Sequence, residues 1–86
     1  MINQILFFHA DWCSQCKLLQ KELKDFNYLP ITEIDADEND SLCDKYNIKS
    51  LPVIILLDES NKEVNRYIGF ISKNDLVNLI KNNNYV

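Results

Sequence analysis

The sequence predicts an α/β fold in which a small mixed β-sheet is flanked by helices. Two uninterrupted apolar runs, residues 5–8 and 53–57, are typical of strands that are buried on both faces. A helical spacing of apolar residues follows the first run, and a second amphipathic pattern occupies residues 76–80. With the shorter segments between them, these observations predict the element order βαβαββα.

The first half of the chain has the pattern of a strand, a helix and a second strand. After the strand at residues 5–8, a helix is predicted from Ser14 to about Phe26, because its apolar residues recur on one helical face. Pro30 then introduces a short strand over residues 31–34. Two strands joined by a helix are expected to be parallel, with a right-handed connection.

The second half has the pattern of a short helix, a hairpin and a last helix. Residues 40–47 predict the short helix, and residues 53–57 and 63–68 predict the two strands of the hairpin. Ser72, with Asp75 three residues later, has the pattern of a helix cap. The helix that follows has an apolar face formed by Leu76, Val77, Leu79 and Ile80.

Composition limits the classes of protein and partner. The 86 residues, 47% of them hydrophobic and one of them glycine, predict a single domain over residues 1–86. A net charge of −4 argues against nucleic acid and anionic membranes as partners. Three cysteines leave at least one thiol unpaired, and neither a signal peptide nor a membrane-spanning run is visible. We therefore expect a cytoplasmic protein whose partner is a protein or a small thiol.

Cys13 and Cys16 form a CxxC pair between the first strand and the first helix. Taken alone, such a pair indicates either a redox dithiol or half of a metal site. Disulfide exchange needs a thiolate that attacks a sulfur–sulfur bond and a second thiol that resolves the mixed disulfide. A sulfur at a helix N-terminus is stabilised in its ionised form by backbone N–H groups. We therefore expect Cys13 to attack and Cys16, one turn inside the helix, to resolve.

Several segments, in order, resemble the motifs of the thioredoxin-like superfamily. Residues 10–17 (ADWCSQCK) resemble A-x-W-C-G-P-C-K, and residues 35–39 (DADEN) resemble the acidic segment that follows the next strand. Residues 45–53 (KYNIKSLPV) resemble K-Y-x-I-x-x-x-P-T, and Gly69 matches the glycine before the last helix. The likeness covers about residues 5–80 and is closer to thioredoxin than to glutaredoxin.

The resemblance implies a minimal thioredoxin fold with a four-stranded sheet in the order 2-1-3-4. It also implies that Pro52 is cis and faces the dithiol, and that backbone preceding it pairs with an extended substrate chain. Trp12, Leu51, Pro52 and Gly69 would line the apolar substrate-binding rim. Phe70, where thioredoxins usually have a small residue, would narrow or extend this groove or belong to the core.

The chain also departs from the family pattern. Ser14 and Gln15 replace the Gly-Pro between the cysteines, so the family's reduction potential cannot be carried over. Phe7 stands where thioredoxins have a buried acid, and Glu33 stands where they have its lysine partner. The chain starts near the first predicted strand of residues 5–8, which leaves the strand of residues 31–34 as an edge.

Three other side chains are candidate modulators or ligands. His9 can exchange a proton with Cys16 or simply fill a position that is aromatic in many thioredoxins, and Lys17 can add positive potential or only be solvated. Cys43 is expected to be a buried core residue, with a third redox thiol as the alternative. A zinc site from Cys13, Cys16, Cys43 and His9 is disfavoured, so no metal is expected.

These observations predict a monomeric thiol–disulfide oxidoreductase that reduces protein disulfides and needs no cofactor besides its own redox-active Cys13–Cys16 disulfide. Its electron donor would be a thioredoxin-reductase-like flavoprotein or another thiol donor. A glutathione-dependent, glutaredoxin-type reductase is the nearest alternative, and service to a partner enzyme such as a ribonucleotide reductase is another. The remaining alternative is a non-catalytic binding module with the same fold.

Overall fold

The computed structural model describes residues 1–83. Its elements follow the predicted order βαβαββα, with a short 3₁₀ turn added before the second helix. They are β1 (Ile2–His9), α1 (Ser14–Glu22), β2 (Ile31–Asp35), η1 (Ala36–Glu38), α2 (Asp40–Lys45), β3 (Val53–Asp58), β4 (Glu63–Ile68) and α3 (Lys73–Asn83).

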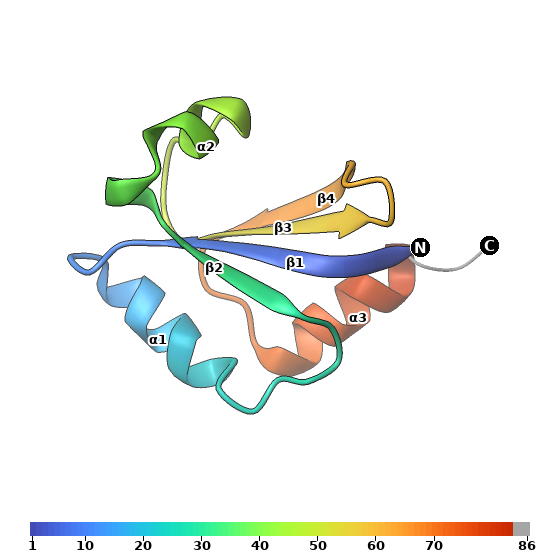
Figure 1. The fold of residues 1–86 in the computed structure, drawn as a ribbon. Helices are drawn as coiled ribbons and strands as arrows, with labels where there is room; N and C mark the ends of the chain where they lie inside the picture. The colour runs from blue at the N-terminus through green and yellow to red at the C-terminus, as the bar shows by residue number, and fades with distance from the viewer. Residues whose placement is uncertain (84–86) are drawn as a thin grey trace.

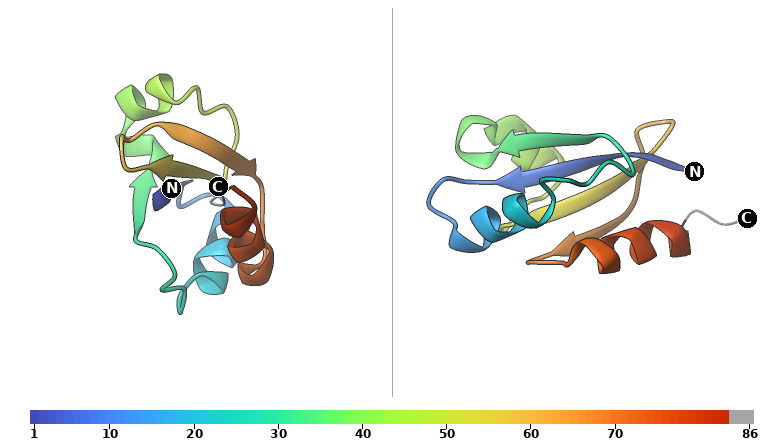
Figure 2. Two further views of the ribbon diagram at one scale, coloured as in Figure 1. Left: turned by 90° about the vertical axis from the view of Figure 1, so that its right-hand side faces the viewer. Right: turned by 90° about the horizontal axis from the view of Figure 1, so that it is seen from below.

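The strands form one mixed sheet in the order β2-β1-β3-β4, which confirms the predicted order. β1 and β2 are parallel, whereas β3 is antiparallel to both β1 and β4. Helices α1 and α3 cover one face of the sheet and α2 covers the other (Figure 1). The two turned views show the same layers, with α1 and α3 on the same side (Figure 2). Among the described residues, no helix has the length and hydropathy needed to cross a membrane.

The two sides of the sheet carry separate apolar cores. Ile5 and Phe7 of β1 belong to the core under α1 and α3, and both are at most 1% exposed. Leu6 and Phe8 belong to the core on the α2 side. This alternation is the period-two pattern of a strand. Because both faces of β1 are buried, its sequence is a continuous hydrophobic run, and the strand was predicted from that run.

Two predicted bounds need correction, because β1 begins at Ile2 rather than Ile5 and the first helix ends earlier than predicted. Helix α1 ends at Glu22 rather than near Phe26, and the chain continues through turns in which the Phe26 N–H donates to the Leu23 carbonyl. Phe26 nevertheless packs against the core under α1 and α3. An apolar residue in a turn thus continued the helical pattern beyond the helix. The predicted cap is present, since the Asp75 N–H donates to the Ser72 hydroxyl at 3.1 Å.

The topology gathers three segments at one end of the sheet. The loop between β1 and α1 begins after His9, which pairs with Asp35 at the end of β2. On the other side of β1, Phe8 pairs with Val53, the first residue of β3, and Val53 pairs with Ile68, the last residue of β4. The CxxC loop, the residues before β3 and the residues after β4 therefore meet at this end.

Candidate functional site: a dithiol at a helix start

Cys13 is the N-cap residue of α1. Its backbone is extended, and its Sγ accepts a hydrogen bond from the backbone N–H of Cys16 at 3.2 Å. The Cys13 N–H in turn donates to the Ala10 carbonyl at 3.1 Å, which holds the loop against the end of β1. A cap position leaves backbone N–H groups directed at the side chain that precedes the helix. The fold therefore places the Cys13 sulfur where negative charge is favoured.

Cys16 lies one turn further into α1 and is buried. It is 1% exposed, Cys13 is 7% exposed, and both are free thiols that cluster with Ala10. Burial raises the pKa of the Cys16 thiol to about 12, helped by its hydrogen bond to Cys13, while a backbone hydrogen bond from Ala10 acts in the opposite direction. At neutral pH Cys16 is therefore a protonated donor beside Cys13.

Leu51, Pro52 and Gly69 adjoin this dithiol. Leu51 is half-buried and packs against the cluster of Ala10, Cys13 and Cys16. The Leu51–Pro52 peptide bond is cis. The Pro52 side chain is buried rather than part of an exposed rim, and its carbonyl accepts the Gly69 N–H at 2.8 Å. This hydrogen bond joins the segment before β3 to the segment after β4.

Gly69 has a φ of +102°, a conformation that side chains with a Cβ rarely adopt. A Cβ built there would meet no heavy atom within 4 Å. The glycine is therefore required by its backbone conformation and not by crowding. The surface above it is open.

Trp12 lies beside the dithiol with 71% of its surface exposed. Its indole Nε1 donates to the Asp37 carboxylate at 2.9 Å. Asp37 belongs to η1, and its own N–H donates to the side chain of Asp35, the cap residue of η1, at 2.9 Å. The sequence does not predict the contact of Trp12 with Asp37, because the contact joins two segments 25 positions apart. The only signal was that Asp37 lies in the acidic segment after β2, at the end of the sheet that carries the CxxC loop.

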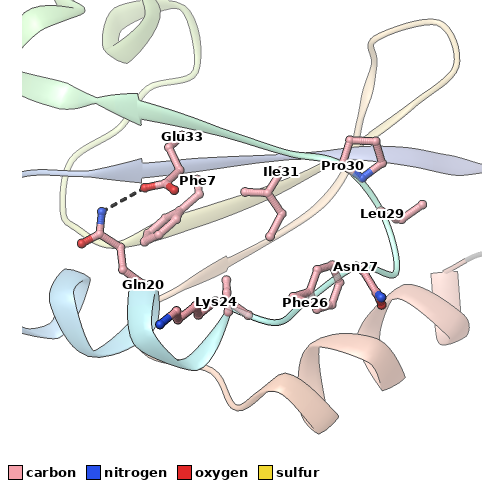
Figure 3. A pocket seen from close by; sticks show the side chains of 10 residues that line it. Phe7, Gln20, Lys24, Phe26, Asn27, Leu29, Pro30, Ile31 and Glu33 are labelled. Atoms are coloured by element: carbon pink, nitrogen blue, oxygen red, sulfur yellow. Dashed lines mark hydrogen bonds between the residues drawn. The ribbon is translucent and has the colours of Figure 1, made fainter.

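Phe7 and Glu33 stand where the family has a buried acid and its lysine partner. The two residues are neighbours, because Phe7 of β1 pairs with Glu33 of β2. Phe7 is 1% exposed. The Glu33 carboxylate is half-exposed and accepts a hydrogen bond from the Gln20 side chain at 2.9 Å (Figure 3). These residues lie at the margin of a pocket of about 520 Å³, which extends towards Pro30 and away from the dithiol.

His9 takes part in the same cluster. Its ring contacts the Phe7 ring at a centroid distance of 5.3 Å, and its Nε2 lies 3.5 Å from a Glu33 carboxylate oxygen. The side chain is 14% exposed. These contacts agree with the interpretation of His9 as a partly buried packing residue. A proton exchange between His9 and Cys16 stays a prediction.

The remaining candidates are not brought to the dithiol in the same way. The Lys17 side chain is exposed on α1. Cys43 is half-buried on α2, not fully buried as predicted, and its Sγ lies 3.7 Å from the Ala36 carbonyl. It packs against the core on the α2 side without being fully covered. Within residues 1–83, no three His, Cys, Asp or Glu side chains are placed to hold a metal ion, so the zinc arrangement is not formed.

Known proteins are similar to this chain in sequence and in structure. The family model described as Thioredoxin matches residues 2–82. Thioredoxin 2 of Plasmodium falciparum is 37% identical over 82 residues, which cover 90% of this chain and 52% of that protein. The chain thus spans about half the length of this relative. Thioredoxin of Mycoplasma genitalium is 34% identical over 84 residues, covering 93% of this chain and 81% of that protein.

Solved structures give the same result. A malaria-parasite thioredoxin-2 structure superposes with a TM-score of 0.82 at 37% identity, covering 92% of this chain and 81% of that one. Thioredoxin 1 of Thermosipho africanus superposes with a TM-score of 0.74 at 30% identity, covering 92% and 91%. The dithiol at the start of α1, the sheet order and these matches lead to one conclusion: the chain belongs to the thioredoxin family.

Proposed function

We propose that the protein reduces disulfide bonds in protein substrates through Cys13 as the attacking thiol and Cys16 as the resolving thiol. The observation that carries the proposal is the position of the two sulfurs. Cys13 caps α1 and accepts the Cys16 N–H, whereas Cys16 is buried behind it. In this arrangement the Cys13 sulfur meets the substrate first, and the Cys16 sulfur reacts only afterwards, with the mixed disulfide.

The reaction is a two-electron exchange in two steps. The Cys13 thiolate attacks one sulfur of the substrate disulfide, that bond breaks, and the other substrate sulfur leaves as a thiolate that takes up a proton. Cys16 then loses its proton and attacks the Cys13 sulfur. This releases the second substrate thiol and forms the Cys13–Cys16 disulfide. A flavoprotein reductase or another dithiol donor must return the two electrons to complete the cycle.

The protonated state of Cys16 gives the two steps their order. Its thiol donates a hydrogen bond to Cys13, and burial raises its pKa to about 12, so it does not compete for the substrate. Cys13, whose sulfur accepts the Cys16 N–H at the start of α1, is the thiol that attacks first. After the first step the Cys13 thiolate no longer exists, and Cys16 lies one helical turn from the mixed disulfide.

Substrate binding involves the backbone of Leu51 and the surface of Trp12 and Gly69. Within residues 1–83 the Leu51 backbone enters no hydrogen bond, so its N–H and carbonyl are available to an extended chain. Trp12 contributes an exposed aromatic surface, and Gly69 leaves open space for the substrate backbone. Pro52 contributes through its position next to Leu51, because its side chain is buried. We place this activity in the cytoplasm and in a monomer.

Insulin reduction tests the proposal. With dithiothreitol as electron donor, the protein is expected to accelerate precipitation of the insulin B chain, and Cys13→Ser is expected to remove the acceleration. Cys43→Ser is the matched control, because Cys43 lies on another helix. Equal rates with and without the protein would contradict the proposal. Faster reduction of hydroxyethyl disulfide by glutathione, with insulin untouched, would instead indicate the glutaredoxin-type activity.

A further inference from the structure

Large apolar side chains are exposed next to the dithiol, on α1 and around Gly69. Trp12 is 71% exposed, Leu18 56%, Ile68 59% and Phe70 41%. Trp12 precedes Cys13, Leu18 lies in the middle of α1, and Ile68 and Phe70 flank Gly69. Apolar surface that stays exposed in this concentration is typical of an interaction site. The exposure of Phe70 also excludes the alternative that it belongs to the core.

Leu18 and Phe70 are the apolar walls of a hollow. Its lining consists of Leu18, Lys21, Glu22 and Phe70, and it encloses about 360 Å³. The two walls come from different elements, because Leu18 projects from α1 and Phe70 lies between β4 and α3. Both ribbon views show the β4–α3 segment passing beside α1 (Figures 1 and 2).

A hydrogen bond ties the two walls of this hollow together. The Glu22 carboxylate, near the end of α1, accepts the backbone N–H of Lys73, the first residue of α3, at 2.7 Å. Carboxylates at a helix N-terminus are stabilised by the unsatisfied N–H groups there. The hollow therefore has walls whose spacing is set before any ligand arrives, which lowers the entropic cost of binding.

One wall of the hollow is next in the chain to the surface assigned to substrate binding in the proposed function. Phe70 directly follows Gly69, and the Gly69 N–H is bonded to the Pro52 carbonyl beside the dithiol. The charges at the rim come from Lys21 and Glu22, one of each sign, so the hollow favours neither anions nor cations. An uncharged apolar side chain can bury its surface against the apolar walls and needs no charged partner at the rim.

We propose that Leu18 and Phe70 form a specificity subsite that receives an apolar side chain of the disulfide-bearing polypeptide, a short distance along the chain from its target cysteine. The inference rests on the proposed function, because it assigns the occupant as the substrate of that reaction. The subsite narrows the class of substrates. The protein prefers polypeptides that have a leucine-like or phenylalanine-like residue near the reducible cysteine over polypeptides with a polar residue at the same place.

Peptide kinetics test this subsite. The probes are disulfide-bonded peptides that are identical except for one leucine, which is moved along the chain and replaced by serine in the reference peptide. Each rate is expressed relative to reduction of 5,5′-dithiobis(2-nitrobenzoate), a small disulfide that lacks a polypeptide. The protein is expected to show a KM about fivefold lower for one leucine position than for the serine peptide.

Two variants test whether Leu18 and Phe70 cause the preference for leucine over serine, and a third variant is the control. Phe70→Ala and Leu18→Ala are each expected to reduce the leucine-to-serine preference to less than twofold. Tyr28→Ala removes an aromatic residue that is 47% exposed on the 23–30 loop, and it is expected to keep the full preference. Absence of any leucine preference, or its persistence in both variants, would overturn the subsite.

The same measurements distinguish failure of the subsite from failure of the proposed disulfide-reductase function. If the protein fails to reduce even the small disulfide, the proposed function fails and the subsite fails with it. If the small disulfide is reduced and no peptide is preferred, only the subsite fails. A concentration-dependent dimer in sedimentation that Phe70→Ala dissociates would show that a second copy occupies the hollow, which would also overturn the proposal.

Discussion

Cys13 lies at the start of the helix that follows β1 and Cys43 lies within the helix that follows β2, but the groups around the two sulfurs have opposite charge. Cys13 is the cap of α1, its Sγ accepts a backbone N–H, and the first turn of α1 contains no acidic residue. Cys43 lies on α2 among carboxylates. Burial raises the pKa of the Cys43 thiol, and the nearby charges of Asp40, Asp44 and Asp37 raise it further.

The difference shows that the position of a sulfur relative to backbone donors and carboxylates, and not its exposure, separates the two thiols. Cys43 is more exposed than Cys13. However, a thiolate at Cys43 would face negative charge, whereas one at Cys13 faces N–H groups. The same fold thus contains one thiol environment suited to exchange and one suited to a packed, protonated side chain. Four experiments test this contrast.

The largest effect is expected from removing the resolving thiol. Cys16→Ser is expected to lower steady-state insulin reduction by at least about a thousandfold, because the mixed disulfide on Cys13 has no internal thiol to release it. Mass spectrometry should then find the substrate attached at Cys13. Cys43→Ser is expected to change the rate by less than about twofold. A trapped substrate on Cys43 would contradict the contrast.

Much of this contrast could be predicted from the sequence. The strand-to-helix position of Cys13 and Cys16 followed from apolar runs and helical spacing, and the cis bond before Pro52 from the family resemblance. The tertiary contacts of Trp12 and Phe26 could not be predicted. The contact of Trp12 with Asp37 depends on how η1 turns after β2, and local periodicity carries no information about it. Phe26 misled the prediction of the end of α1 because a core contact made from a turn has the same spacing as one made from a helix.

The second effect concerns stability in alkaline solution. The pKa of Cys16 is raised from its ordinary value of 9.0 to about 12 by burial, followed by its hydrogen bond to Cys13. The unfolded chain therefore releases this proton near pH 9, while the folded chain keeps it. The contribution to the free energy of unfolding is complete below pH 9 and is lost as the pH rises towards 12. Urea unfolding over this pH range measures the loss.

Tyrosines and lysines ionise in the same range, so variants must isolate the contribution of Cys16. In Cys16→Ala the decline of the free energy of unfolding with pH is expected to be shallower than in the unmodified protein. In Cys43→Ala, whose removed thiol also has a raised pKa, the decline is expected to become shallower by less than in Cys16→Ala, because Cys43 is only half-buried. Equal slopes in all three proteins would show that Cys16 keeps its ordinary pKa in the folded state.

A smaller effect is expected from weakening the negative charge around Cys43. Asp40→Asn removes the carboxylate whose charge contributes most, after burial, to the raised pKa of Cys43. The alkylation rate of Cys43 by iodoacetamide at pH 8 should rise about two- to threefold, because more of this thiol is ionised. Peptide mapping of each cysteine gives the rate, and the remote Asp25→Asn is the control. An equal rise in both variants would indicate an effect of net charge alone.

The smallest effect is expected at the contact that joins the two regions. The Asp37 carboxylate holds the Trp12 indole beside the dithiol, and its negative charge also faces Cys43. Asp37→Ala should free the indole and raise KM for a protein disulfide about twofold, because exposed hydrogen bonds of this kind contribute little. Trp12 is the chain's one tryptophan, so its fluorescence reports the change directly. Asp37→Asn keeps an acceptor and should retain most of the native emission, whereas an equal shift in the neighbouring Glu38→Ala would show that charge, not the hydrogen bond, positions the ring.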